Sequence, residues 1–378
     1  MIYITTRQKH HEKQISWMDL LEGAEVPVDY GQDHVLTGTV TRCVESVDRK
    51  LVDAARIPFA ITWLINFNHR HADLFRDDMS TLYRHFTIPK KTGGLRPIDA
   101  PCDGLQSALR ELKDFLSERL GIMYHTSAFA YVPGRCITDV LKKHQNNESN
   151  WFIKTDFSGF FPSTTLDFTM KMLSMIFPTN EICKTEMGRN ALRKALSLGF
   201  LNGGLPQGTA LSPYLTNVIM IPIDHYLFNE LAHHRYVYTR YADDIQISCI
   251  QKFNPDKVVA LIRRAIREFE APYTIKDEKT HFGSRKGRNW MLGLKLNADN
   301  DIKIGFEKKK LFKAMTSNFI LDTKNGKFWA RDAVHSYEGL RSYYHMVEPE
   351  YFEGLTKHFN QKYHTNLKTL IDSYLCNN

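Results

Sequence analysis

The sequence has few cysteines, and no two of them stand at the spacing of a metal-ligand or redox pair. The six are scattered along the chain: Cys43, Cys102, Cys136, Cys183, Cys249 and Cys376. Structural zinc sites and thiol–disulfide exchange motifs need a Cys-x-x-Cys pair, so neither is predicted. Scattered free thiols are typical of a reducing compartment, and we therefore expect a cytoplasmic protein.

Long apolar runs, a signal sequence and internal repeats are absent as well. No apolar run approaches the roughly 20 residues of a membrane span, and the opening stretch MIYITTRQKHHEKQ turns polar too early for a signal peptide. We therefore expect no membrane partner. With 43% hydrophobic residues among 378, the chain can bury a sizeable core and form two or three subdomains. The formal net charge of +8 is compatible with a polyanionic partner, although many soluble proteins share such a charge.

The hydrophobic pattern mixes strands and helices along the chain. Strands are predicted in a hairpin over 83–101, from 151 to a turn at Pro162, on both sides of positions 243–244, and in a hairpin over 290–306. Helices are predicted over 47–67 with an interruption at Pro58, over 105–120, twice within 164–200, over 209–232, over 255–271, and from 307 onward. This order predicts an α+β protein with an antiparallel core and a helical tail.

Two adjacent carboxylates, Asp243 and Asp244, lie between two apolar runs in YTRYADDIQISC. Such a pair is common at surface turns, where it has no function. A third carboxylate, Asp156, follows the apolar run WFIKT, and two strands can bring these ends together. Three clustered acids repel one another unless cations neutralise them, and carboxylates suit Mg²⁺, which also binds phosphate oxygens. Two ions about 4 Å apart would activate an attacking hydroxyl and stabilise a leaving pyrophosphate.

Five sequence blocks around these acids occur in a fixed order. They are FTIPKKTGGLRPIDAP, SAFAYVPGRCITDVLKKH, DFSGFFPS, GGLPQGTALSPYLTN and YADD. From about Tyr83 to about Phe306 the chain resembles bacterial reverse transcriptases of the group II intron and retron type, and YEGLRSYYHMVEPEYFEGL resembles their thumb. The resemblance implies a right-hand polymerase fold. Its parts would be an N-terminal extension (1–70), fingers with part of the palm (71–155), a palm (156–306) and a short helical thumb (307–378).

The resemblance also implies an activity, RNA-directed DNA polymerisation by two-metal nucleotidyl transfer. A primer 3′-hydroxyl would attack the α-phosphate of a deoxynucleoside triphosphate (dNTP), and pyrophosphate would leave. Asp156, Asp243 and Asp244 match the catalytic acids that hold two Mg²⁺ ions, and the carbonyl of Phe157 would be a further ligand.

Phe161, Gln207 and Gly208 match residues that contact the incoming nucleotide. A bulky ring at Phe161 would collide with a ribose 2′-hydroxyl; the alternative, a core aromatic, suits the neighbouring Phe160 better. The Gln207 amide would hydrogen-bond the sugar or base, and Gly208 would permit close approach of the backbone. A lone Pro-Gln-Gly would be an ordinary loop before a helix, but Ser212 and Pro213 strengthen the match.

Cationic side chains match further contacts to the nucleotide. Lys90, Lys91 and Arg96 match the fingers hairpin that closes over the triphosphate, although Lys91 suits a solvated turn equally well. Lys279 matches a lysine near the pyrophosphate, where it would donate a proton to the leaving group; a solvated lysine is the alternative. The residues matched to template or primer contacts are Arg135, Tyr241, Leu292 and Gly293.

The blocks do not fix the subgroup of reverse transcriptase. Retron enzymes usually carry Val-Thr-Gly near the primer grip, where this chain has MLG, and a block with a His that NALRK lacks. The tail is too short for a maturase region, and no fused nuclease is visible. By elimination the chain looks like the stand-alone, defence-associated or "unknown group" enzymes, often encoded beside a structured non-coding RNA. The implied partners are that RNA as template, the dNTPs and the DNA product, with homo-oligomer formation possible.

Three other functions remain open at this point. Abortive-infection relatives suggest untemplated or protein-primed DNA synthesis, in which a Tyr or Ser hydroxyl of the chain starts the product. An RNA-binding scaffold without catalysis would be expected to have lost catalytic acids, and all three are present. An RNA-dependent RNA polymerase is disfavoured by the bulky side chain of Phe161.

Overall fold

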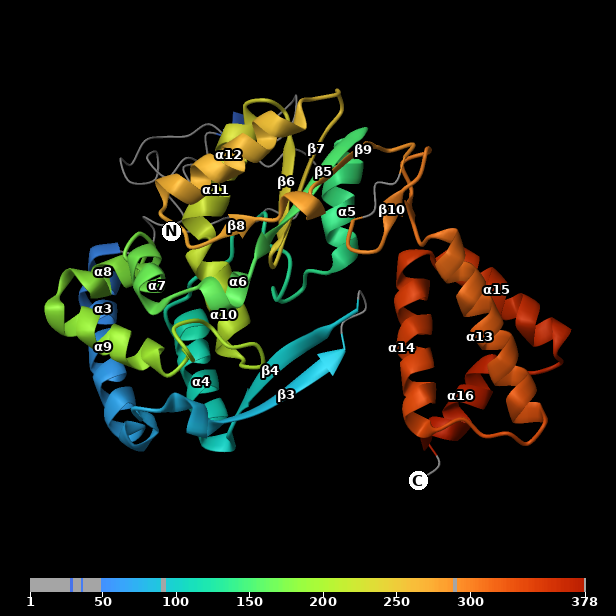
Figure 1. Ribbon diagram of the computed structural model, residues 1–378, viewed down its shortest axis with the longest axis horizontal. Helices are drawn as coiled ribbons and strands as arrows, with labels where there is room; N and C mark the ends of the chain where they lie inside the picture. The colour runs from blue at the N-terminus through green and yellow to red at the C-terminus, as the bar shows by residue number, and fades with distance from the viewer. Residues whose placement is uncertain (1–27, 30–34, 37–48, 90–92, 288–290, 377–378) are drawn as a thin grey trace. The chain divides into compact units, whose positions relative to one another are not determined.

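The computed structural model describes residues 28–29, 35–36, 49–89, 93–287 and 291–376 (Figure 1). They form two compact units that alternate along the chain. The first is drawn from Met1–Arg135, Lys154–Ile247 and Asn254–His281, and the second from Cys136–Ile153, Ser248–Phe253 and Phe282–Asn378. The division into extension, fingers, palm and thumb stays a prediction. Within the described ranges, no helix is long and apolar enough to cross a membrane.

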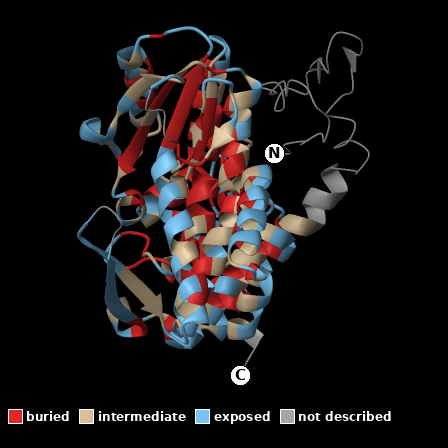
Figure 2. Cartoon of the chain, turned by 90° about the vertical axis from the view of Figure 1, so that its right-hand side faces the viewer, coloured by how far each residue is buried: buried red, intermediate tan, exposed pale blue. Residues whose placement is uncertain are grey.

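A five-stranded sheet carries the segments that were predicted to hold the acids. Its strands run in the order β6 (Val237–Tyr241), β7 (Asp244–Cys249), β5 (Trp151–Ser158) and β8 (Thr274–Ile275), and β9 (His281–Ser284) also pairs with β5. Figure 2 shows most of the sheet buried, in agreement with the apolar runs of the sequence. The predicted strands on both sides of positions 243–244 are confirmed. Neither β8 nor β9 was predicted, because two and four residues are too few to show a period.

Figure 1 also shows the helices of the first unit. They are α3 (Arg49–Arg70), α4 (Asp103–Asp114) with a π-helical extension (Phe115–Arg119), α6 (Phe160–Ser163), α7 (Leu166–Leu173), α8 (Thr179–Lys184), α9 (Glu186–Ser197), α10 (Leu211–Ile219), α11 (Ile221–Ala232) and α12 (Pro255–Glu268). Three predictions were wrong in detail. Helix α3 continues through Pro58, since one proline removes only one hydrogen bond. Residues 164–200 form three helices. The single helix over 209–232 is two, because Pro222 has no N–H to give to the Val218 carbonyl.

The predicted hairpin over 83–101 is confirmed. Strands β3 (Tyr83–Pro89) and β4 (Leu95–Pro101) pair antiparallel, with Tyr83 opposite Pro101. Arg96 lies exposed on β4. Lys90 and Lys91 fall outside the described residues.

The second unit joins three separate stretches of chain. The N–H of Asn150 donates to the Cys249 carbonyl at 3.0 Å, and the N–H of Arg285 donates to the Asn150 carbonyl at 2.7 Å. The unit contains α5 (Ile137–Asn146), a hairpin of β10 (Lys295–Leu296) and β11 (Ile302–Lys303), and the helices α13 (Phe306–Lys324), α14 (Arg331–Val347), α15 (Pro349–Lys362) and α16 (Leu367–Cys376). The predicted second hairpin and the helical tail are confirmed.

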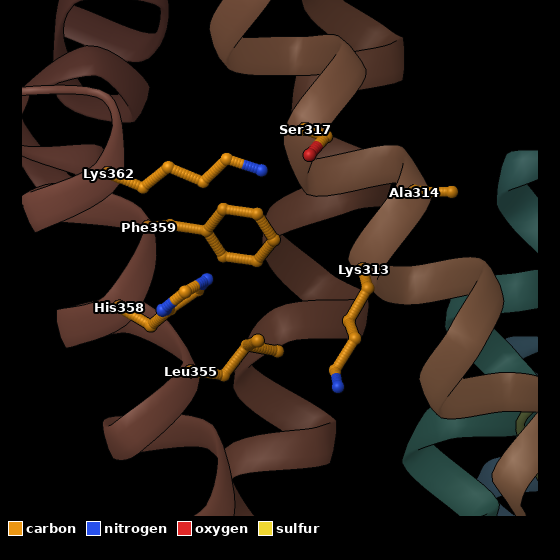
Figure 3. A pocket seen from close by; sticks show the side chains of 7 residues that line it. All are labelled: Lys313, Ala314, Ser317, Leu355, His358, Phe359 and Lys362. Atoms are coloured by element: carbon orange, nitrogen blue, oxygen red, sulfur yellow. The ribbon is translucent and has the colours of Figure 1, made fainter.

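Helices α13 and α15 of the second unit line a small open pocket of about 280 Å³. Figure 3 shows its lining: Lys313, Ala314, Ser317, Leu355, His358, Phe359 and Lys362. The lining contains no carboxylate, so this pocket is not the cation site predicted for Asp156, Asp243 and Asp244.

Candidate active site

The sheet brings the three predicted acids together. Asp156 lies near the end of β5, and Asp243 and Asp244 lie at the turn between β6 and β7. Strand β7 is the neighbour of β5 in the sheet. The N–H of Phe157 donates to the Asp243 carbonyl at 3.1 Å, which joins the two segments directly. The turn itself is tight, because Ala242 has a positive φ of 57°.

Negative charge accumulates at this turn. Loss of hydration, followed by the charge of Asp156, raises the pKa of Asp243. The pKa of Asp244 rises to about 6 because of desolvation first, and then because of the charges of Asp243 and Asp156. A cation bound beside these carboxyls would favour their ionised forms and offset the repulsion among the three acids.

Two lysines meet Asp156 from the segment after β8. Lys279 Nζ donates to Asp156 Oδ2 at 2.7 Å, and Lys276 Nζ lies 3.7 Å from the same oxygen. The hydrogen bond to Asp156 raises the pKa of Lys279. The other oxygen of Asp156, Oδ1, is buried and has no hydrogen-bond partner. Lys279 was predicted to meet pyrophosphate; here its ammonium lies on the Asp156 carboxylate.

A divalent cation suits this donor set, although the side chains are not arranged around one. Among the described residues, no three His, Cys, Asp or Glu side chains stand together in a way that could hold a metal ion. The acids nevertheless offer hard carboxylate oxygens, an unpartnered buried Oδ1 on Asp156, and the raised pKa values of Asp243 and Asp244. Those are the properties of a site for a hard divalent cation.

Phe161 lies half-buried in α6, while its neighbour Phe160 is a core residue. The Phe160 ring is 3% exposed and stacks on Phe157 at 5.8 Å. The Phe161 carbonyl accepts from the N–H of Leu205 at 3.0 Å. Gly204 lies so close to this turn that a Cβ would be 2.0 Å from the Pro162 oxygen. The backbone of α6 and that of the Gly204 loop are therefore in direct contact.

The loop with Gln207 and Gly208 is joined to the hairpin that carries Arg96. The N–H of Asp99 donates to the Gln207 carbonyl at 2.8 Å. Gly208 has a φ of 134°, and a Cβ there would lie 2.7 Å from the Asp99 carbonyl oxygen. Only glycine fits this approach to the hairpin backbone, and the nucleotide contact expected of Gly208 stays a prediction.

A fully buried ion pair supports the turn that carries the acids. Arg240 donates from Nε and Nη2 to the two oxygens of Asp224, at 2.8 and 2.7 Å, and the Tyr238 hydroxyl donates to the same carboxylate at 2.7 Å. Arg240 Nη1 donates to the Ala242 carbonyl at 3.0 Å and to Asn217 Oδ1 at 3.1 Å. This network was not predicted from the sequence. Its one signal there was the presence of Asn217 and Asp224 within a largely apolar helical run.

The residues matched to template and primer have mixed surroundings. Arg135 Nη1 donates to the carbonyls of His125 and Ala128, so a phosphate would have to meet the other side of the guanidinium. Leu292 and Gly293 lie in the second unit at positive φ values of 51° and 84°, in a tight turn. Tyr241 ends β6, two residues before Asp243. Their nucleic-acid contacts stay predictions.

Comparison with known proteins gives a consistent result. A protein-family model described as "Reverse transcriptase (RNA-dependent DNA polymerase)" matches residues 88–310. The retron Ec83 reverse transcriptase of Escherichia coli is 27% identical over 298 residues, which cover 76% of this chain and 90% of that protein. The retron Mx162 reverse transcriptase of Myxococcus xanthus is 27% identical over 298 residues, with coverage of 72% and 59%.

Among solved structures, apo telomerase from Candida tropicalis aligns with a TM-score of 0.46 at 13% identity, covering 82% of this chain and 66% of that one. The curated relatives correct one expectation. The MLG and NALRK departures were read as arguments against a retron-type enzyme, yet the chain is similar to retron reverse transcriptases despite them.

Proposed function

Because the chain belongs to the reverse transcriptase family of RNA-directed DNA polymerases, we propose that its three-acid site copies a structured non-coding RNA into DNA in bacterial antiphage defence. The observation that carries the catalytic part is the meeting of Asp156 with Asp243 and Asp244 at adjacent strands, where the charges of Asp243 and Asp156 raise the pKa of Asp244. The similarity to retron enzymes and the sequence resemblance support the choice of template and biological setting.

In this proposal Asp156, Asp243 and Asp244, with the Phe157 carbonyl, hold two Mg²⁺ ions. Bound there, the ions supply Lewis-acid activation of a primer hydroxyl and neutralisation of the leaving pyrophosphate. Side chains of the protein carry out the other steps. Lys279, which is hydrogen-bonded to Asp156, donates a proton to the leaving group, and Phe161 excludes the 2′-hydroxyl of a ribonucleotide.

The remaining predicted residues orient the substrates. Gln207 and Gly208 form the floor beneath the nucleotide, and Arg96, with Lys90, neutralises the triphosphate from the fingers hairpin. The hydrogen bond from the Asp99 N–H to the Gln207 carbonyl connects the loop that contains Gln207 and Gly208 to the fingers hairpin. Arg135, Tyr241, Leu292 and Gly293 meet template and primer. A cytoplasmic location and assembly into a homo-oligomer complete the proposal.

The test is expression from the native locus, with and without phage, followed by purification and sequencing of bound RNA and DNA. The matched control is the Asp243→Asn, Asp244→Asn double variant. DNA complementary to one bound RNA, absent from the control, is the expected result. Homopolymeric DNA, or DNA that leaves the phenol phase only after protease treatment, would favour untemplated or protein-primed synthesis instead. Bound RNA without DNA under both conditions would indicate a scaffold.

A further inference from the structure

Tyr131 is a residue of the first unit to which the functions above give no role. It lies in the turn after Ala130 and is 55% exposed. Its backbone has a positive φ of 57°, which is costly for a residue with a Cβ. An exposed aromatic held in a strained conformation needs a reason, and such strain concentrates at functional sites.

Buried side chains fix the turn of Tyr131 to the turn of the acids. Asn217 Nδ2 donates to the Ala130 carbonyl at 2.7 Å, and its Oδ1 accepts from Arg240 Nη1. The same Nη1 donates to the Ala242 carbonyl, one residue before Asp243. One amide and one guanidinium, both fully buried, therefore hold two left-handed residues, Tyr131 and Ala242, in a fixed relation.

The side chain of Tyr131 lies beside Phe161 and near Asp243. Its ring meets Phe161 edge-on, with centroids 6.5 Å apart and planes at 71°. Burial raises the pKa of its hydroxyl, the charges of Asp243 and Tyr241 raise it further, and Arg96 lowers it. The Tyr131 ring thus contacts Phe161, the residue expected to exclude the ribose 2′-hydroxyl, and the Tyr131 hydroxyl interacts electrostatically with Asp243.

We propose that Tyr131 is a specificity-determining residue that positions Phe161 against the sugar of the incoming nucleotide. The Phe161 ring contacts two others, that of Phe160 at 5.7 Å and 72° and that of Tyr131. In this proposal the two rings together keep Phe161 from turning away from the space that a 2′-hydroxyl would need. The inference deepens the proposed polymerase function and rests on it.

The experiment measures kcat/KM for a dNTP and for the matching ribonucleotide, on an RNA template with a DNA primer. Tyr131→Ala should lower the preference for the deoxynucleotide by about tenfold or more, the range for a change of one or a few methylene-sized contacts in a pocket. Tyr131→Phe, which keeps the ring, should stay within about twofold of the wild type by the same reasoning. Met187→Ala, at a 64% exposed residue on α9, is the control and should change nothing.

The double variant separates positioning from a general structural role. If Tyr131 acts through Phe161, then Tyr131→Ala should add nothing to the loss of preference caused by Phe161→Ala. An equal fall in kcat/KM for both sugars would overturn the inference, and so would additive losses in the double variant. Tyr131→Leu takes the place of Tyr131→Ala if the alanine variant melts early. A wild-type enzyme that extends no primer would overturn the proposed function as well, whereas an active enzyme with an unchanged preference would overturn only the role of Tyr131.

Discussion

Replacing Arg240 by methionine should destabilise the first unit more than replacing both members of its ion pair. Both side chains are fully buried, and Arg240 donates two hydrogen bonds to Asp224. In Arg240→Met the Asp224 carboxylate keeps the Tyr238 hydroxyl but loses its cation. Leaving a buried charge without its partner costs about 3–5 kcal/mol of folding free energy.

The double variant Asp224→Leu, Arg240→Met removes the charge altogether. Like Arg240→Met, it leaves the Ala242 carbonyl and Asn217 Oδ1 without the guanidinium that donates to them. It adds only the Tyr238 hydroxyl, whose lost partner costs about 1–3 kcal/mol. Exchange of a whole buried ion pair for apolar side chains is otherwise often neutral, or stabilising by about 1–4 kcal/mol. We therefore expect the double variant to be more stable than Arg240→Met alone.

Differential scanning calorimetry measures both effects. For a unit of this size each kcal/mol shifts the melting temperature by about 2–4 °C, so Arg240→Met should lower it by roughly 6–20 °C. Primer extension at a temperature where the double variant is folded should still fall by about 100-fold, because the Ala242 carbonyl loses the hydrogen bond that fixes the turn carrying Asp243. A double variant no more stable than Arg240→Met would refute the charge argument. Full polymerase activity in the double variant would refute the positioning argument.

Three further predictions test other parts of the molecule. Gly204→Ala should reduce primer extension by about 100-fold, since its Cβ would lie 2.0 Å from the Pro162 oxygen, while Gly283→Ala, with nothing within 4 Å, should be normal. Burial lowers the pKa of His144 from 6.5 to about 3, so below 6.5 the unfolded chain takes up a proton that the folded chain does not. Protonation of His144 in the unfolded chain therefore leaves the free energy of unfolding unchanged at neutral pH and lowers it by about 2 kcal/mol at about pH 5. Urea unfolding at the two pH values should show that His144→Gln loses about 2 kcal/mol less stability on acidification than the wild type. A pH dependence equal to that of the wild type would contradict this prediction. Lys279→Ala should tighten Mn²⁺ binding roughly fivefold in electron paramagnetic resonance titrations without nucleotide, because about 1 kcal/mol of repulsion and competition is removed; weaker binding would contradict this.

The sequence was informative where a local pattern decides the structure. The hairpin over 83–101 follows from two β-prone runs around a glycine pair, and the two strands beside Asp243 follow from apolar runs on both sides of it. The meeting of Asp156 with Asp243 could be expected because both follow strands, and a sheet places strand ends together.

Other parts of the site depend on contacts that no local pattern encodes. The Asp224–Arg240 pair joins a helix residue to a strand residue, and only the packed fold shows that both are buried. The left-handed conformation of Tyr131 could not be predicted either, because only glycine signals a positive φ in a sequence. The ion pair between Lys279 and Asp156 joins residues far apart in the sequence, so the residues around Lys279 do not predict it.

The alternation of the two units along the chain has a consequence for synthesis on the ribosome. Residues 136–153 and 248–253 leave the ribosome early, but the stretch that completes their unit begins only at Phe282. The N–H of Asn150 has its acceptor on Cys249, and its carbonyl has its donor on Arg285. About a hundred residues separate Asn150 from its acceptor on Cys249, and more than a hundred separate it from its donor on Arg285, so these two hydrogen bonds form only late in translation. A fragment ending before Phe282 cannot complete the second unit, so partial chains of that kind are substrates for chaperones and proteases rather than independent domains.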